Sequence, residues 1–143
     1  MSDYKKWLNE IGLTEEQAWI LINMDNVIEV EHFNYHKEKS NIHNIGVFAS
    51  KNIKKGEVIG DVTIDNYYRT VLGRWVNHSK DKNAKFYNKK DNNLVAIAEK
   101  DILRNEEILI DYRDHTDKNP AFKEAIDKIK NLFNKDQNPK NQL

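Results

Sequence analysis

Apolar and polar residues alternate over several short stretches in the middle of the chain, and this pattern predicts short β-strands. The stretch from Val27 to Phe33 alternates as a strand does, and extended structure resumes from Gly46 to Ala49. The residues between them, Tyr35 to Asn44, are mostly polar and are predicted to form a loop. A turn at Lys55–Gly56 leads into a strand at Glu57–Ile59. Further strands are predicted at 84–87, 94–98 and 108–112.

The two ends of the chain carry helical patterns instead. A capping box, in which Thr14 and Gln17 each pair with the other's backbone, predicts a helix that begins near Glu15. Towards the other end, Asn119 followed by Pro120 suits the start of a second helix. Apolar residues then recur at helical spacing over about four turns: Ala121, Phe122, Ala125, Ile126, Ile129, Leu132 and Phe133.

Short strands without a regular alternation of strand and helix favour a mainly β domain with flanking helices. Between Asp61 and Gly73 the pattern fits either a helical turn or an extended connection. We therefore predict a helical extension at 1–25, a β domain at 26–115, a C-terminal helix at 116–134 and a disordered polar tail at 135–143.

Composition narrows the classes of function. The chain has 143 residues, near the usual size of one domain, and its 23 Lys and Arg residues balance 23 Asp and Glu residues. A net charge of zero does not favour a nucleic-acid partner, because such proteins hold phosphates with excess positive charge. No stretch approaches the ~20 apolar residues of a membrane span, and the first residues lack the apolar region of a signal peptide. We therefore expect a cytoplasmic protein with no membrane partner.

The chain contains no cysteine, which excludes disulfides, thiol chemistry and Cys-rich zinc sites. Its five histidines also lack metal-ligand spacing supported by nearby carboxylates, so no metal site is predicted. These histidines are His32, His36, His43, His78 and His115.

Two short stretches carry groups that could bind a ligand. Gly46 precedes an extended Val-Phe-Ala, and a glycine there allows the backbone amides to approach an anion, although a plain hairpin turn would read the same way. Asn77, His78 and Ser79 follow apolar residues where a buried strand ends, which suits either a ligand site or a satisfied hydrogen-bond network in the core.

Three motifs in register give the strongest signal. They are Asn44–Ala49 (NIGVFA), Arg74–Ser79 (RWVNHS) and Asn105–Tyr112 (NEEILIDY). In this order and spacing they resemble the SET-domain protein lysine methyltransferases, whose motifs read G-x-G followed by Phe-Ala, R-F-x-N-H-S-C and G-E-E-L-x-x-D-Y. The resemblance covers roughly residues 26 to 115 and implies the β-clip fold of that family. In this fold the Asn-His-Ser and Asp-Tyr segments form a pseudoknot.

The resemblance also implies the residues of a site for S-adenosylmethionine, with S-adenosylhomocysteine as product. The glycine loop would receive the amino acid end of the cofactor, together with Asn77, and the His78 backbone would meet the adenine edge. Arg74 and Trp75 would line or brace the pocket, and Tyr112 would stand where the cofactor methyl meets the substrate lysine. The cofactor-binding residues implied are Asn44, Ile45, Gly46, Val47, Arg74, Trp75, Asn77 and His78.

The chain departs from the family pattern at two positions. Asn44 replaces the first glycine of G-x-G, a change that asparagine tolerates because it adopts left-handed backbone readily. Lys80 replaces the cysteine that many relatives use as a zinc ligand, so the zinc-bound cap of those relatives cannot form. We expect the C-terminal helix to act as the cap, and the substrate channel or cap is assigned to Tyr68, Tyr112, Phe122 and Phe133.

The reaction implied by the resemblance is methyl transfer to the side-chain amine of a lysine in a protein. The amine must be neutral to attack, and freeing its lone pair at neutral pH costs about 4 kcal/mol for a lysine of pKa near ~10.4. A dry channel and a neighbouring positive charge both reduce this cost, and holding the reactants in line supplies much of the acceleration. Tyr112 would therefore orient groups and need not titrate.

Glu106 and Glu107 are interpreted as turn and surface residues, and Asp111 as a residue that fixes the local backbone. The short span between Asp61 and Gly73 resembles minimal SET domains of viral or bacterial origin. The resemblance implies a lysine-bearing protein as substrate, with a histone as one candidate, and a homodimer stays an open alternative.

Two rival functions remain open at this stage. The run from Ala49 to Ile59 also resembles the A-x-x-I-x-x-G-x-x-I pattern of antifreeze-like, sugar-binding β-clip modules, which lack the other two motifs. A SET domain that has lost turnover and acts as an interaction module is the second rival.

Overall fold

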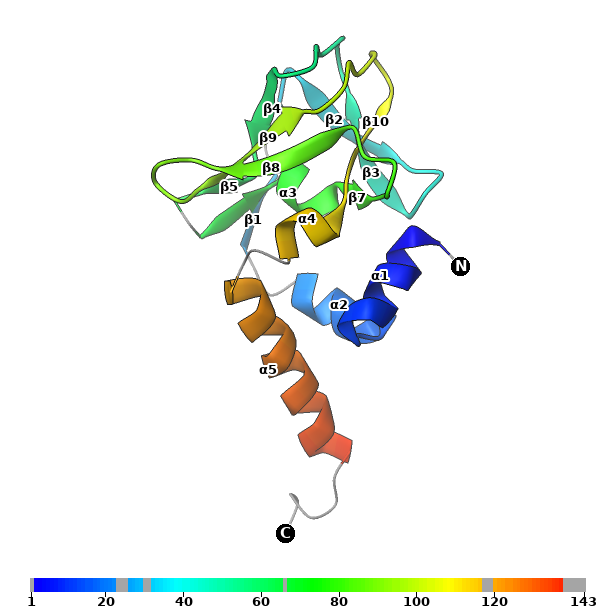
Figure 1. The fold of residues 1–143 in the computed structure, drawn as a ribbon, viewed down its shortest axis with the longest axis vertical. Helices are drawn as coiled ribbons and strands as arrows, with labels where there is room; N and C mark the ends of the chain where they lie inside the picture. The colour runs from blue at the N-terminus through cyan, green and yellow to red at the C-terminus, as the bar shows by residue number, and fades with distance from the viewer. Residues whose placement is uncertain (1, 23–25, 30–31, 66, 117–119, 138–143) are drawn as a thin grey trace. The chain divides into compact units, whose positions relative to one another are not determined.

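The computed structural model describes residues 2–22, 26–29, 32–65, 67–116 and 120–137. The chain divides into two compact units (Figure 1): Asp25–Asp114 forms one, and Met1–Met24 with His115–Leu143 forms the other. The larger unit holds the strands and the smaller one is helical. No helix of the described residues is long and apolar enough to cross a membrane.

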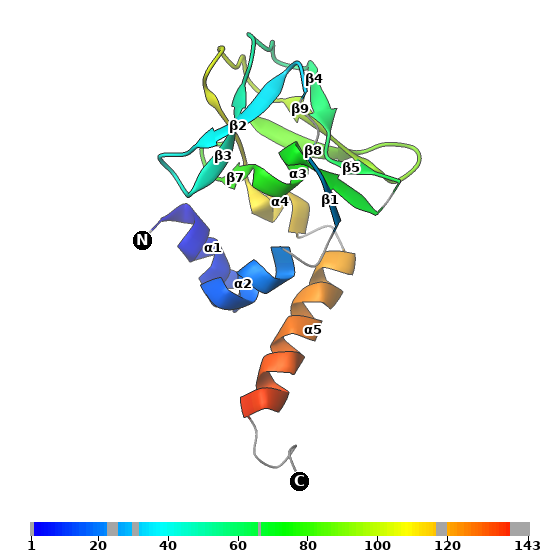
Figure 2. The same cartoon turned by 180° about the vertical axis from the view of Figure 1, so that it is seen from behind.

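The first sheet of the larger unit has the strand order β2-β3-β10-β7. Its strands are β2 (Tyr35–Lys39), β3 (Ile45–Ala49), β10 (Glu107–Ile110) and β7 (Asn77–His78). The strand β3 pairs antiparallel with both β2 and β10, whereas β10 pairs parallel with β7. Figure 2 shows this sheet from behind, with segments far apart in the sequence lying side by side.

Two smaller sheets complete the β domain. The order β4-β9-β8 joins β4 (Val58–Asp61), β9 (Leu94–Ala98) and β8 (Ala84–Asn88). The order β1-β6-β5 joins β1 (Asn26–Ile28), β6 (Tyr68–Thr70) and β5 (Thr63–Ile64). Two short helices, α3 (Val71–Trp75) and α4 (Tyr112–Thr116), follow β6 and β10. The mainly β architecture predicted from the pattern of short strands is confirmed.

One apolar core joins the β2-β3-β10-β7 sheet, the β4-β9-β8 sheet and α3. Most of its residues are small or β-branched, so it can be compact despite the polar composition. Ile53 and Ile102 are fully buried and bridge two loops through reciprocal backbone hydrogen bonds of 2.7 Å. The strands that carry the second and third motifs are anchored in this core by Val76, Ile108 and Ile110.

The helical unit contains α1 (Asp3–Ile11), α2 (Glu15–Ile22) and α5 (Pro120–Gln137). The predicted capping box is confirmed, since the Thr14 amide donates to Gln17 Oε1 at 2.8 Å and the Gln17 amide donates to Thr14 Oγ1 at 3.1 Å. Gly12 ends α1 in the left-handed conformation, with φ of 75°, and glycine adopts it without strain.

Four secondary-structure predictions need correction. Tyr35–Lys39, expected to be loop, is β2, and the strand expected from residue 27 to 33 is only Asn26–Ile28 among the described residues. Tyr112, placed at a strand end, begins α4 instead. The last helix reaches Gln137, into the segment expected to be disordered. Residues 138–143 lie outside the described part of the chain.

Candidate functional site

The second and third motifs meet through the parallel pairing of β7 with β10. Asn77 lies opposite Leu109 and His78 lies opposite Ile110, although about thirty residues separate them in the sequence. The Ser79 amide extends this pairing by donating to the Ile110 carbonyl at 3.0 Å. A parallel pair needs a long connection between its strands, and here the intervening chain forms β8 and β9.

Asn77 occupies the junction between the first and second motifs. Its buried side chain donates through Nδ2 to the carbonyls of His43 and Ile45, at 3.1 and 3.3 Å, and to Glu107 Oε2 at 2.8 Å. Three surrounding acceptors fix which end of the amide is nitrogen. Within the described part of the chain, no donor forms a hydrogen bond to Asn77 Oδ1. This oxygen can therefore accept a hydrogen bond from a ligand.

Glu107 connects Asn77 to the loop between β2 and β3. The Ser40 hydroxyl donates to its carboxylate, with oxygen–oxygen distances of 2.7 and 3.0 Å. The same Ser40 oxygen accepts from the amides of Ile42 and His43 at 2.9 and 3.3 Å. The interpretation of Glu107 as a surface residue is therefore wrong, because its half-buried carboxylate ties together the two motifs and the loop.

Gly46 packs against this same carboxylate. A Cβ at position 46 would lie 2.2 Å from Glu107 Oε2 and 3.0 Å from Asn77 Nδ2, and real Cβ atoms do not approach so closely. The glycine therefore leaves room for Glu107, and the predicted approach of an anion to the backbone here stays a prediction. Asn44, two residues earlier, adopts a positive φ of 40°, as expected of an asparagine that replaces glycine.

His78 and Tyr112 lie in contact at the end of the β7–β10 pair. The Tyr112 amide donates to His78 Nδ1 at 2.9 Å, so this nitrogen carries no proton and the buried ring is neutral with its proton on Nε2. The 3.7 Å approach of His78 Nδ1 to Asp111 Oδ1 is therefore not an ion pair. The two rings lie 4.9 Å apart, and the Tyr112 hydroxyl donates to the Val76 carbonyl at 2.6 Å.

Asp111 fixes the start of α4, as the sequence predicted. Its Oδ1 accepts from the Arg113 amide and from Arg113 Nε, both at 3.0 Å. Partial burial tends to raise the pKa of Asp111, but the hydrogen bonds and charge of Arg113 outweigh this effect and hold the pKa below its usual value. Asp111 is therefore ionised near neutral pH and acts on the backbone that positions Tyr112.

The side chain of Asn83 forms hydrogen bonds with the backbone of β10. Its side chain donates to the Glu107 carbonyl through Nδ2 and accepts from the Leu109 amide through Oδ1, both at 2.8 Å. The Asn83 amide also donates to the Leu109 carbonyl at 3.0 Å. These hydrogen bonds resemble those that a neighbouring strand would make. They fix the position of β10, which carries Glu107 and leads into Tyr112.

Arg74 and Trp75 belong to a second cluster on α3. The Arg74 guanidinium lies 4.0 Å from the centre of the Trp75 ring, and Lys37 Nζ lies 5.2 Å from it. Trp75 Nε1 donates to Glu29 Oε1 at 3.4 Å, and the hydrogen bond from Lys37 is the main cause that lowers the pKa of Glu29. This arrangement braces α3 against its neighbours, and the predicted part of Arg74 and Trp75 in a cofactor pocket stays a prediction.

The predicted channel and cap residues are spread over both units. Tyr68 lies on β6, partly exposed and edge-on to Tyr67, with ring centres 4.9 Å apart. Phe133 is half-buried in α5, and the side chain of Phe122 lies outside the described residues. The channel and cap roles therefore stay predictions. In the described part of the chain, no group of three or more metal-ligating side chains gathers.

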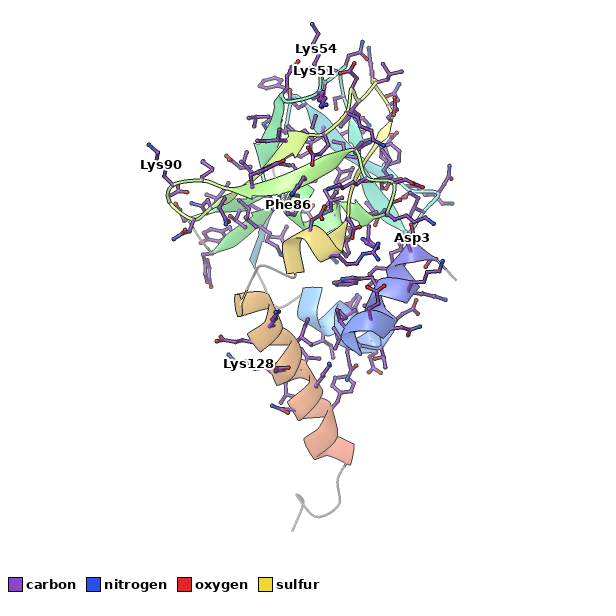
Figure 3. The ribbon with its side chains drawn as sticks, in the orientation of Figure 1. Asp3, Lys51, Lys54, Phe86, Lys90 and Lys128 are labelled. Atoms are coloured by element: carbon purple, nitrogen blue, oxygen red, sulfur yellow. The ribbon has the colours of Figure 1, made fainter. Side chains whose placement is uncertain are left out.

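Two lysines in the segment 80–90 differ in their contacts. Lys82 contacts both Asp114 and Glu99, and the hydrogen bond to Asp114 is the main cause that raises its pKa. Lys90 is exposed and projects from the turn between β8 and β9 (Figure 3).

Ser40, Asn83 and Glu107 are the site residues that sequence reasoning missed. Their partners lie 67, 26 and 30 residues away in the chain, so no local spacing marks them. One signal was present for Glu107, because the strand pattern places it on the opposite face from the buried Ile108 and on the same face as Leu109, the residue paired with Asn77.

Comparisons with known proteins match part of the chain to a family. A family model described as SET domain matches residues 60–113. A humanized mutant of the Chaetomium thermophilum Polycomb Repressive Complex 2 is a similar solved structure, with 21% identity over 56% of this chain and a TM-score of 0.48. A putative histone methyltransferase of Plasmodium falciparum has 25% identity, with 57% of this chain and 95% of that one covered and a TM-score of 0.45.

A third similar structure is ctPRC2 in an autoinhibited conformation bound to S-adenosylmethionine, with 19% identity over 56% of this chain and a TM-score of 0.47. The matched part makes up only 15% of the chain in both this structure and the humanized complex. No curated protein matches the sequence significantly. Residues 60–113 therefore match the SET domain, and the mainly β architecture of the chain fits this match.

Proposed function

We propose that this chain is an S-adenosylmethionine-dependent methyltransferase that acts on the side-chain amine of a lysine in a protein. One observation carries the proposal. In a chain that matches the SET domain, the parallel pairing of β7 with β10 brings Asn77, His78 and Tyr112 together. Their polar groups converge at the end of buried strands, where binding sites commonly form.

The residues around Asn77 fit the amino acid end of the cofactor. An ammonium group needs hydrogen-bond acceptors, and Asn77 Oδ1 is an acceptor on the same amide whose Nδ2 donates to the half-buried carboxylate of Glu107. Asn77 and the main chain of 44–47 would hold the amino acid end, and the backbone of His78 would meet the adenine. When bound, S-adenosylmethionine supplies a methyl group carried on a sulfonium.

Tyr112 is proposed to orient the reacting groups. Its backbone is fixed by the bond to His78 Nδ1 and by the Asp111 turn, so the ring has a defined position. A neutral His78 beside it adds no proton that must be moved during the reaction. A lysine entering this site must arrive neutral or lose its proton, and burial of the amine lowers its pKa in the required direction.

The substrate is proposed to be a lysine-bearing protein, and a histone is one candidate. The C-terminal helix α5 (Pro120–Gln137) is proposed to close the site in place of a zinc-bound cap, which a chain without cysteine cannot form. Both statements rest on the family resemblance.

Calorimetric titration tests cofactor binding directly. We expect S-adenosylmethionine and S-adenosylhomocysteine to bind with Kd in the micromolar range, because both carry the same amino acid and adenosine parts. Adenosine alone is the matched control and should bind more weakly, since it lacks the groups that Asn77 would hold. Absence of heat with both cofactors would contradict the proposal and would favour a non-catalytic β-clip module.

A further inference from the structure

We propose that Glu107 and Ser40 are positioning residues that set Asn77 and the β2–β3 loop for the amino acid end of the cofactor. This inference rests on the proposed function, because the ligand it concerns is S-adenosylmethionine. Glu107 has no part in the roles that the family motif assigned to Asn77, His78 and Tyr112. Its place in the site follows from its contacts alone.

Glu107 helps to fix the orientation of the Asn77 side-chain amide. If this amide were rotated by half a turn, Oδ1 would point at three acceptors: the His43 carbonyl, the Ile45 carbonyl and Glu107 Oε2. The carboxylate is the only charged group of the three, and it makes the shortest bond, 2.8 Å. Charge-assisted hydrogen bonds are about twice as strong as neutral ones. Glu107 therefore contributes most to holding Oδ1 on the side from which a ligand can reach it.

Ser40 connects Glu107 to the β2–β3 loop. Ser40 donates to the Glu107 carboxylate and accepts from the amides of Ile42 and His43, so one hydroxyl links the carboxylate to the loop backbone. The Ser40 amide also donates to the Asn44 carbonyl at 2.8 Å. The loop is thus held in the shape in which Asn44 has a positive φ, at the position where the family has glycine.

Gly46, Asn77 and Glu107 pack tightly against one another. Glu107 Oε2 occupies the space that the Cβ of any other residue at position 46 would need. A change of shape at position 46, 77 or 107 therefore disturbs the other two positions. Because a carboxylate stands at this point, the site favours the ammonium group of an amino acid ligand over its carboxylate.

The experiment compares two ligands on the folded full chain. S-adenosylhomocysteine carries the amino acid part, whereas 5′-methylthioadenosine has the adenosine and the sulfur but lacks that part. For Glu107→Gln, which keeps the size of the side chain and removes its charge, we expect the affinity for S-adenosylhomocysteine to fall about tenfold or more. The affinity for 5′-methylthioadenosine should change by less than about twofold, because its groups do not reach Asn77.

Glu106→Gln is the matched control, because Glu106 is the exposed neighbour and its side chain accepts from the Leu103 amide in the turn. It should leave both affinities unchanged. A second measurement needs no ligand: amide hydrogen exchange at Ile42 and His43 should become faster in Ser40→Ala and in Glu107→Gln but not in Glu106→Gln.

The outcomes separate the inference from the proposed function. If the wild-type chain binds S-adenosylhomocysteine but Glu107→Gln binds it equally well, the positioning role is overturned and the proposed function stands. An equal loss of affinity for both ligands would also overturn the role, because it would indicate a general structural defect. If the wild-type chain binds neither ligand, the proposed function fails and the inference fails with it.

Discussion

Replacing Tyr112 with phenylalanine is expected to slow methyl transfer about 100-fold or more while the affinity for S-adenosylhomocysteine changes by less than about twofold. The substitution removes only the hydroxyl. The backbone bond to His78 Nδ1, the contact between the rings and the contacts of Asn77 all persist. The proposed cofactor site therefore stays intact, while the hydroxyl proposed to lie at the reacting atoms is lost. Single-turnover kinetics and calorimetry measure the two quantities separately.

The Tyr112 hydroxyl also bonds the Val76 carbonyl, so a loss of stability must be distinguished from a loss of turnover. We expect Tyr112→Phe to lower the free energy of unfolding by about 1 kcal/mol, the usual contribution of one hydrogen bond. Tyr67→Phe is the matched control, because Tyr67 is exposed in the turn between β5 and β6. Unchanged methylation by Tyr112→Phe would remove Tyr112 from the catalytic role.

The second large effect is expected for Asn77→Asp, which keeps the shape of the side chain but replaces its donor with a carboxylate. The new group would face the His43 and Ile45 carbonyls and the carboxylate of Glu107, all of which now accept from Nδ2. We expect the free energy of unfolding to fall by about 3 kcal/mol and the affinity for S-adenosylhomocysteine to fall at least about 100-fold. Urea unfolding and calorimetry measure these changes.

A double variant tests whether repulsion causes the effect. Adding Glu107→Gln to Asn77→Asp supplies an amide that can donate to the new carboxylate, so part of the lost stability should return. Asn77→Ala serves as comparison, because it removes the donor without adding a charge and should destabilise the chain less. A double variant less stable than Asn77→Asp alone would contradict the role given to the Glu107–Asn77 contact.

The sequence predicted those parts of the fold that depend on local patterns. The capping box of Thr14 and Gln17 involves residues three positions apart, and both of its hydrogen bonds are present. The sequence also predicted the turn at Gly56 and the strand after it. The backbone at Gly56 has a φ of 89°, which favours glycine, so the glycine itself marks the turn. Local chemistry was sufficient in both cases.

The strand β2 was missed for a physical reason. Only Tyr35 of its five residues is buried, and its last three residues are exposed, so its composition resembles that of a loop. It is a strand because it pairs with β3 along its whole length from Tyr35 to Lys39. Such pairing is decided by the partner strand and cannot be read from the segment itself.

The site shows the same limit. Motif spacing singled out Asn77, His78 and Tyr112, which the parallel pairing of β7 with β10 brings together. It did not single out Asn83, whose amide imitates a strand against β10, or Ser40, whose hydroxyl reaches Glu107 from the β2–β3 loop. These residues act through contacts that exist only once the pseudoknot has formed.

Transfer of an isotopically labelled methyl group would show whether the chain methylates lysine. The full chain would be incubated with S-adenosylmethionine carrying a deuterated methyl group and with a proteome extract, and peptides would be searched by mass spectrometry for labelled lysine. We predict label on lysine side-chain nitrogen with the wild-type chain and about 100-fold less with Tyr112→Phe. A wild-type chain that binds the cofactor but places no more label on lysine than Tyr112→Phe would contradict the account.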